Sequence, residues 1–413
     1  MRKKYVSIIL ALSVLVIASC SHKENNSLTT GDSTKPKNSP IGNNSSNNEV
    51  VTTEPPQSNS SESSSPLDLH LEKIQGDITN IHYADGNQII ILADKLYLYN
   101  LDKGLVTAET SREALVKEQY FSTHDGYVEI GAKVSKGKNN GGLLATDGGP
   151  TYSAVFYDKQ LNKKSEFQFN TLLQKNEMIL SVKAIAITAD GTKAAYATTQ
   201  GLYLYNFKTK QKTTVVNVQE EDSAPRKGVV TFEQIGFTNM DKLLAFKAQS
   251  FHIPAETDKP SFDTCGTVAI DGSSMSNRVF DSYTCKEVTA YSNLLLFAED
   301  FTIPSGKLMV MDIPSEKVNL HTLVEKGESG FITGSDSGQY FGTSLADKSS
   351  WKIRVYNTVT GRLEAEKRIP AEGEARYMAN DPLIRIIDDK KTYIVVLGAN
   401  QPGIKAKVII NHF

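Results

Sequence analysis

The residue types that most often carry catalysis are scattered along this sequence. Its seven histidines are widely separated, and none has the H-E-x-x-H spacing of a zinc site. Residues 334 to 338, Gly-Ser-Asp-Ser-Gly, place Asp where a G-x-S-x-G nucleophile elbow needs Ser. The sequence contains no P-loop, dinucleotide-binding glycine motif or EF-hand loop. We therefore predict no catalytic residue, no metal and no cofactor, and the sequence favours a protein that is not an enzyme.

The N-terminus has the pattern of an export signal. Residues 2 to 4 are basic, and residues 5 to 18 form an apolar stretch shorter than the roughly 20 residues of a permanent membrane helix. Its end, Val16-Ile17-Ala18-Ser19-Cys20, resembles the lipobox of bacterial lipoproteins. That resemblance implies removal of a signal peptide, residues 1–19, and a diacylglyceryl group on the sulfur of Cys20. An additional acyl chain on the new amino group would make the anchor stable.

Residues 20–66 comprise the lipidated Cys and a predicted tether. From 21 to 66 the composition is rich in Ser, Asn, Thr and Pro and contains no aromatic residue. Such a segment cannot bury enough apolar surface to offset its ordering entropy, so we predict a disordered tether with an end-to-end distance of roughly 35 to 40 Å. We expect an extracytoplasmic protein, on the outer face of the membrane in a monoderm or on the periplasmic side of the envelope in a diderm. The long tether favours the monoderm.

The remainder, residues 67–413, repeats a short apolar run that ends in Asn or Asp. The seven endings are Asn100, Asp158, Asn206, Asp271, Asp312, Asn357 and Asn411. They recur at intervals of 41 to 65 residues, near the roughly 40 to 50 residues of a four-stranded propeller blade. We predict an all-β domain of seven four-stranded blades, with each ending on a third strand. The strand-like segment 69–74 would complete the last blade and close the ring.

The third repeat is the clearest of the seven. Its segment Ala189-Asp190-Gly191-Thr192-Lys193-Ala194-Ala195-Tyr196 resembles the TolB-like, WD40-like and YVTN-type propellers. That resemblance implies the scaffold and leaves the activity open. Quinoprotein propellers use Trp repeatedly, whereas this chain has one Trp, so a quinone cofactor is not expected. The formal net charge is −2 without a basic stripe, so we expect no nucleic-acid partner.

Two cysteines remain after lipidation of Cys20. Cys265 is expected before the third strand of the fourth blade, and Cys285 after its fourth strand. In an oxidising compartment we predict a disulfide between them. Two free buried thiols and a zinc-binding pair are the alternatives.

Long insertions between second and third strands are predicted to gather at one face of the ring. They are residues 136–150, 250–264, 300–306, 345–350 and 398–406. Candidate binding residues on this face are Phe251, His252, Phe262, Phe301, Trp351 and Lys138. The alternative is that the aromatic rings pack the loops onto the blades, and that Lys138 lies in a solvated loop.

Two classes of function follow from these features. The favoured one is a membrane-tethered, non-enzymatic scaffold that binds a protein or an envelope polymer through the long loops. The alternative is an extracytoplasmic hydrolase or lyase acting on carbohydrate or peptide, with acidic residues in the central channel. A small-molecule or metal sensor is a third, minor possibility.

Overall fold

The computed structural model describes most of the domain from residue 73 onward. The described residues are 73–76, 78–85, 87–112, 115, 117–133, 150–175, 177–217, 220–221, 228–238, 241–251, 262–273, 275–278, 285–290, 294–299, 307–312, 318–322, 329–335, 337–346, 350–370, 382–397 and 407–413. The predicted signal peptide, Cys20 and the tether lie outside them. No helix within the described segments is long and apolar enough to cross a membrane.

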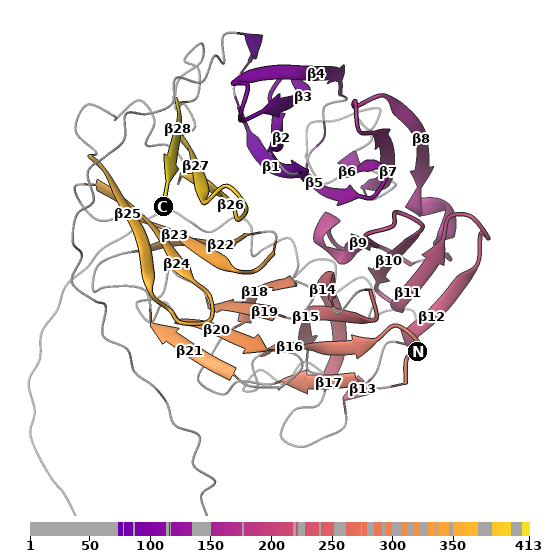
Figure 1. Ribbon diagram of the computed structural model, residues 1–413. Helices are drawn as coiled ribbons and strands as arrows, with labels where there is room; N and C mark the ends of the chain where they lie inside the picture. The colour runs from indigo at the N-terminus through magenta and orange to yellow at the C-terminus, as the bar shows by residue number, and fades with distance from the viewer. Residues whose placement is uncertain are drawn as a thin grey trace, which may run out of the picture. The chain divides into compact units, whose positions relative to one another are not determined.

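Seven antiparallel sheets follow one another around a ring, which confirms the predicted seven-bladed all-β fold (Figure 1). Blade 1 holds β1 (Asn80–Asp85), β2 (Gln88–Leu92), β3 (Lys95–Asn100) and β4 (Leu105–Ser111). Blade 2 holds β5 (Lys117–Thr123), β6 (Gly126–Lys133), β7 (Thr151–Asp158) and β8 (Lys163–Gln168). Blade 3 holds β9 (Ile185–Ile187), β10 (Lys193–Thr198), β11 (Gly201–Asn206) and β12 (Lys212–Asn217). The short 3-10 helices η3 (Phe169–Leu172) and η4 (Val182–Ala184) lie between blades 2 and 3 in sequence.

The later blades follow the same plan with two variations. Blade 4 holds β13 (Glu220–Glu221), β14 (Gly228–Thr238), β15 (Leu243–Phe251), β16 (Phe262–Ala269) and β17 (Met275–Arg278). Blade 5 holds β18 (Cys285–Ala290), β19 (Leu294–Glu299), β20 (Lys307–Asp312) and β21 (Val318–Thr322). Blade 6 holds β22 (Ser329–Gly334), β23 (Tyr340–Ala346), β24 (Ser350–Asn357) and β25 (Leu363–Pro370). Blade 7 holds β26 (Leu383–Ile387), β27 (Thr392–Leu397) and β28 (Lys407–His412). Blade 4 therefore has five strands, and the described part of blade 7 has three.

The core lies between the blades, where apolar side chains of neighbouring sheets interlock. Blades 1 and 2 share a cluster around Leu96 and Tyr127, and blades 2, 3 and 4 share one around Tyr196. Smaller clusters join blade 4 to 5, blade 5 to 6 and blade 6 to 7. A last cluster joins blade 7 to blade 1, so every junction of the ring is apolar. Because the aromatic and branched residues that favour strands also fill these junctions, each blade is stabilised by both of its neighbours.

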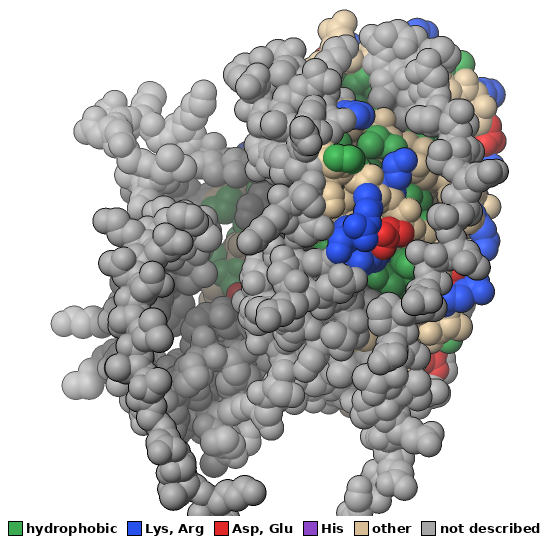
Figure 2. All heavy atoms as spheres, turned by 90° about the vertical axis from the view of Figure 1, so that its left-hand side faces the viewer, with side chains coloured by type: hydrophobic (Ala, Val, Ile, Leu, Met, Phe, Trp, Pro, Cys, Tyr) green, Lys and Arg blue, Asp and Glu red, His purple; other side chains and the backbone are tan. Residues whose placement is uncertain are grey.

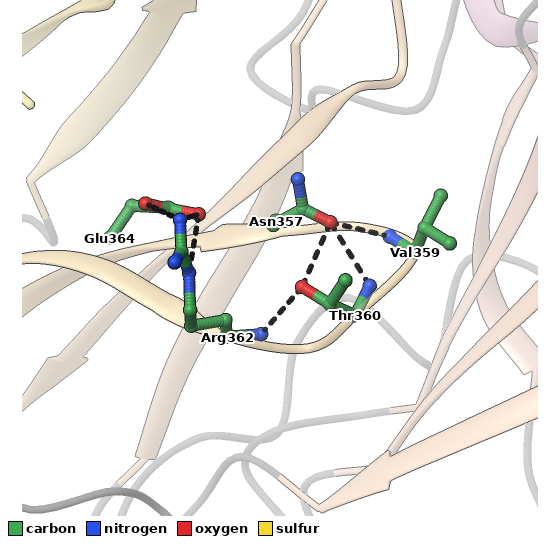
Figure 3. Close-up of polar contacts among 5 residues, drawn as sticks. All are labelled: Asn357, Val359, Thr360, Arg362 and Glu364. Carbon is green, nitrogen blue, oxygen red and sulfur yellow. Dashed lines mark hydrogen bonds and ion pairs between the residues drawn. The ribbon is translucent and has the colours of Figure 1, made fainter.

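In five of the seven repeats, the described contacts show the final Asn or Asp capping the turn after the third strand. In blade 6 the Oδ1 of Asn357 accepts hydrogen bonds from the backbone N–H of Val359 at 3.1 Å and from the backbone N–H and hydroxyl of Thr360, each at 3.0 Å (Figure 3). Asn100, Asp158, Asn206 and Asp271 accept backbone N–H bonds in the same way. The recurring residue is therefore an Asx-turn acceptor that starts a tight connection.

Blade 1 meets blade 7 where the ring closes. Ile74 is 2% exposed and packs in the cluster that also contains Ile394 and Ile410 of blade 7. On the surface, the Lys390 Nζ lies 3.3 Å from a carboxylate oxygen of Asp102. The predicted closing strand, 69–74, lies mostly outside the described residues, and its described end, residues 73 and 74, is not in a strand. The visible closure is therefore side-chain packing.

Candidate functional site

A cavity of about 680 Å³ lies against the first strands of blades 1, 6 and 7. Its lining comes from β1, β22, β23, β26, β27 and η4, with Pro382 just before β26. The first strand of a propeller blade borders the central channel, so the cavity is part of that channel. The lining residues are Asn80, Ile81, His82, Lys183, Ile332, Thr333, Ser344, Pro382, Leu383, Ile384, Arg385, Ile394 and Val396.

The charged groups in this lining are basic. Lys183 comes from η4, and Arg385 comes from β26. Neither Asp nor Glu occurs among the described lining residues. The acidic channel expected for a hydrolase or lyase therefore has no counterpart in the described cavity wall.

Two polar groups of the lining are buried without a hydrogen-bond partner among the described residues. They are the Nε2 of His82 and the hydroxyl of Ser344. Ser344 is 2% exposed. The His82 ring also packs against Tyr120, with ring centroids 4.7 Å apart. Burial, assisted by the positive charge of Arg385, holds the pKa of His82 well below its usual value. His82 is therefore a neutral imidazole at neutral pH.

A second polar cluster is buried inside blade 2. The Glu129 carboxylate accepts hydrogen bonds from the Tyr120 hydroxyl at 2.6 Å and from the Tyr157 hydroxyl at 2.8 Å. Burial raises the pKa of Glu129, although both tyrosine hydrogen bonds act in the opposite direction. Nearby, Arg112 donates to Glu118 at 2.9 Å. Neither Glu129 nor Glu118 is among the described residues that line the cavity, so this cluster is separate from the cavity wall.

The outer strands of blade 6 carry a mixed group of charges. Figure 2 shows basic side chains beside acidic ones on the side of the molecule where β24 and β25 lie. Within these strands the Glu366 carboxylate accepts hydrogen bonds from Arg354 at 2.9 Å and from Arg368 at 3.0 Å. Because the charges of these three residues are satisfied within the blade, they do not mark a binding site for an ion.

Most of the predicted loop-face residues fall at or beyond the edge of the described structure. Lys138, His252 and Phe301 lie outside the described residues. Phe251 ends β15 and Phe262 begins β16, so both flank the insertion of blade 4; their side chains lie outside the description.

Trp351 does not have the exposed position expected of a binding residue. It is the second residue of β24 and pairs with Ala346 and Ile369. Its side chain is packed in the core shared by blades 6 and 7, and the residue is 3% exposed. The ring is therefore a core group, which corrects its assignment to the binding face.

The two cysteines occupy neighbouring blades. Cys265 lies within β16, the fourth blade's third strand counted from β14, and Cys285 begins β18, the first strand of blade 5. The expected position of Cys265 is corrected, because it lies in the strand instead of before it. Cys285 does follow the fourth strand of blade 4, counted from β14, and it opens the next blade. Cys265 is fully buried in the cluster that joins blades 4 and 5. The side chain of Cys285 lies outside the description, so the disulfide stays a prediction.

The long insertions do occupy equivalent places in the fold. In blades 2, 4, 5 and 7 a long connection joins the second strand, counted outward from the channel, to the third: 134–150, 252–261, 300–306 and 398–406. In blade 6 the predicted insertion 345–350 is wrong, because β23 and β24 extend into it and leave only the three-residue connection 347–349. In blades 1 and 3 the same connections are only 93–94 and 199–200. In four antiparallel strands all these connections leave the ring at one end, here called the loop end, whereas the other hairpin turns leave at the opposite end.

The channel was not predicted as a basic site because its lining residues are far apart in sequence. Lys183 comes from η4, Ser344 from blade 6 and Arg385 from blade 7, and none belongs to a short motif. No group of three or more possible His, Cys, Asp or Glu metal ligands occurs in the described part of the chain.

Comparison with known proteins bears on the fold alone. No protein-family model and no curated protein matches the sequence. Among solved structures, the chain is similar to the crystal structure of the Myceliophteria thermophila Cps50 (Swd1) β-propeller domain, with a TM-score of 0.53 and 9% sequence identity. The match covers 82% of this chain and 97% of that one. The ring of seven sheets and this similarity together show that the chain contains a seven-bladed β-propeller.

Proposed function

We propose that this protein is a lipid-anchored, extracytoplasmic scaffold that binds a protein or an envelope polymer at the loop end of its propeller. The observation that carries the proposal is the placement of the four long connections, in blades 2, 4, 5 and 7. All join second to third strands, whereas two blades have the shortest hairpin at that point. A rigid ring that lengthens its loops at one end resembles other scaffolds whose loops perform recognition.

Anchoring is supported by the sequence around Cys20, which ends an apolar stretch of export-signal length. A lipid on this residue would hold the propeller at the membrane surface, with the Ser- and Asn-rich segment as spacer. Cys20→Ser should release the protein from the membrane fraction and abolish incorporation of an alkyne-labelled fatty acid. Unchanged labelling of the variant would contradict the proposed anchor.

The binding role is tested by crosslinking in cells, followed by affinity capture and mass spectrometry. The test variant shortens the connections 134–150 and 252–261, which leaves the paired residues of β15 and β16 in place. The matched control is Val359→Asp, because Val359 is 65% exposed in a turn that leaves the ring at the opposite end. Partners captured by wild type and by the control, but lost with the shortened loops, would support the scaffold. Absence of a reproducible partner for wild type would contradict it.

We also propose that Cys265 and Cys285 form a disulfide between blades 4 and 5. The support is that β16 and β18 are in contact and that Cys265 lies in the apolar cluster of this junction. A disulfide that closes the loop of about 20 residues between Cys265 and Cys285 would contribute on the order of 3 kcal/mol to stability in the chain-entropy model. Peptide mapping without reduction should recover the two cysteines in one linked pair. Recovery of both as alkylated thiols from exported protein would exclude the bridge.

A further inference from the structure

We propose that the outer turns of blades 2 and 3 dock on an anionic lipid surface, and that this contact directs the loop end of the propeller away from the membrane. The proposal rests on the lipid anchor proposed above, which would keep the domain close to such a surface. The turns lie in residues 158–164, from the end of β7 into β8, and 206–212, from the end of β11 into β12. Both leave the ring opposite the loop end, here called the turn end.

Lysine is concentrated in these two segments. Together they contain six lysines and a single acidic residue, Asp158. All six lysines are exposed. They are Lys159, Lys163, Lys164, Lys208, Lys210 and Lys212.

Two of the lysines supply the charge that remains unbalanced. The other four interact with groups of the domain; among them, the Nζ atoms of Lys163 and Lys164 lie 2.7 and 2.9 Å from carboxylate oxygens of blade 2. Lys208 and Lys210 form no ion pair within the described part of the chain. The patch therefore keeps a net positive charge after its internal pairs are counted, and that charge is centred on the turn of blade 3.

The turn that carries Lys208 and Lys210 is held firmly against blade 2. The Phe207 ring packs edge-on against Phe156 and Phe167, with ring centroids 5.0 and 5.2 Å apart. At the start of the turn, the recurring Asn accepts two successive backbone N–H groups, the first of them that of Lys208, each at 2.9 Å. Blades 2 and 3 thus present their lysines on one continuous surface (Figure 1).

Lys210 occupies a backbone position that favours glycine. Its φ is +58°, and the corresponding residues of blades 1 and 6, also four places after the recurring Asn, are Gly104 and Gly361, with φ of +60° and +67°. A residue with a Cβ is strained there, whereas glycine is not. Strained positions are characteristic of functional sites, so the strain at Lys210 indicates that its side chain has a role outside the fold.

An anionic membrane suits a weak patch on an anchored domain. Each lysine close to such a surface improves binding by roughly fivefold, so two unbalanced lysines give only a modest affinity. A lipid anchor would raise the local concentration of the surface, and a modest affinity is then enough for docking. With the turn end on the membrane, the long connections of the loop end would face outward, where a partner could reach them.

The test measures co-sedimentation with lipid vesicles. The full chain carries Cys20→Ser, so that no lipid anchor contributes. We expect binding to vesicles that contain phosphatidylglycerol, none to phosphatidylcholine alone, and loss of binding in about 0.5 M salt. No binding, or equal binding to both kinds of vesicle, would overturn the docking and leave the anchor, tested by fatty-acid labelling, unaffected. Binding to soluble polyphosphate without binding to the vesicles would also overturn it and indicate an anionic polymer.

Single substitutions locate the contact. Lys208→Gln and Lys210→Gln should each weaken vesicle binding about fivefold. Lys175→Gln is the matched control, because Lys175 is also exposed but lies between β8 and β9, in a connection at the loop end. An equal loss with Lys175→Gln would show that the overall charge of the protein, and not the turn end, causes the binding.

A second variant at Lys210 separates docking from folding. Lys210→Gly removes the same charge as Lys210→Gln but also relieves the backbone strain. It should therefore weaken vesicle binding equally and yet unfold at a higher urea concentration than Lys210→Gln. Unchanged vesicle binding by Lys210→Gly, or a urea midpoint no higher than that of Lys210→Gln, would contradict the role assigned to this lysine.

Discussion

Glu129 shows how one buried carboxyl group depends on its immediate partners. It lies directly opposite Tyr120 in the pairing of β5 with β6, and Tyr157 reaches it from β7. Tyr157→Phe should lower the free energy of unfolding by about 1–3 kcal/mol, because it leaves a buried carboxylate oxygen without its donor. Urea denaturation measures this change. In a Glu129→Gln background the same substitution should cost clearly less, and equal costs in both backgrounds would show that the hydrogen bond is not the cause.

The raised pKa of Glu129 also predicts a pH dependence of stability. Because burial raises this pKa above its value in the unfolded chain, the folded state binds the proton more tightly. The stabilisation by this proton is fully present below the unfolded pKa of about 4.5 and is lost as the pH rises through the folded pKa. Relative to Glu129→Gln, wild type should therefore lose stability as the pH rises from about 4.5 toward neutral. A difference that is constant, or that grows in favour of wild type, would contradict this reasoning.

The turn after a blade's third strand depends on one side-chain acceptor. Asn357 Oδ1 receives three hydrogen bonds, and Gly361 follows with φ of +67°. Asn357→Ala should cost about 1–2 kcal/mol, whereas Asn357→Asp keeps the acceptor and should cost much less. Chemical denaturation of both variants gives the comparison. If Asp is as destabilising as Ala, the amide group, and not the acceptor oxygen, is what the turn requires.

The same turn shows what could be predicted at the level of elements. The repeated Asn or Asp predicted the number of blades and, to within two residues, the end of each blade's third strand, because an Asx turn is local and is visible in the sequence. Links between blades leave no such mark. Ala189 donates its backbone N–H to the Asp241 carboxylate at 3.0 Å, and Ser337 donates to Asp388 at 2.9 Å, each across a blade junction. These partners are about a blade apart in sequence, so only the assembled ring identifies them.

At the scale of the whole molecule, the ring creates sites that no single blade contains. The channel cavity combines residues from blades 1, 6 and 7 and from η4, and the sequence could predict a central channel but not the basic residues in its wall. Four of the five insertions were predictable because they interrupt a repeat. For Trp351 the sequence allowed both an exposed and a packed position, and only the assembled junction of blades 6 and 7 shows that the ring is packed.

Ring closure predicts that the first and last blades unfold together with the others. Ile74→Ala removes a 2% exposed side chain from the junction of blades 1 and 7 and should cost about 2–5 kcal/mol. Trp351, the only Trp, reports from the junction of blades 6 and 7. Its fluorescence midpoint in urea should therefore shift together with the circular dichroism signal, whereas Leu105→Ala, at a 39% exposed position of β4, should leave both within about 0.5 kcal/mol. An early dichroism transition with an unchanged Trp351 midpoint would mean that blade 1 detaches alone and that the ring does not act as one cooperative unit.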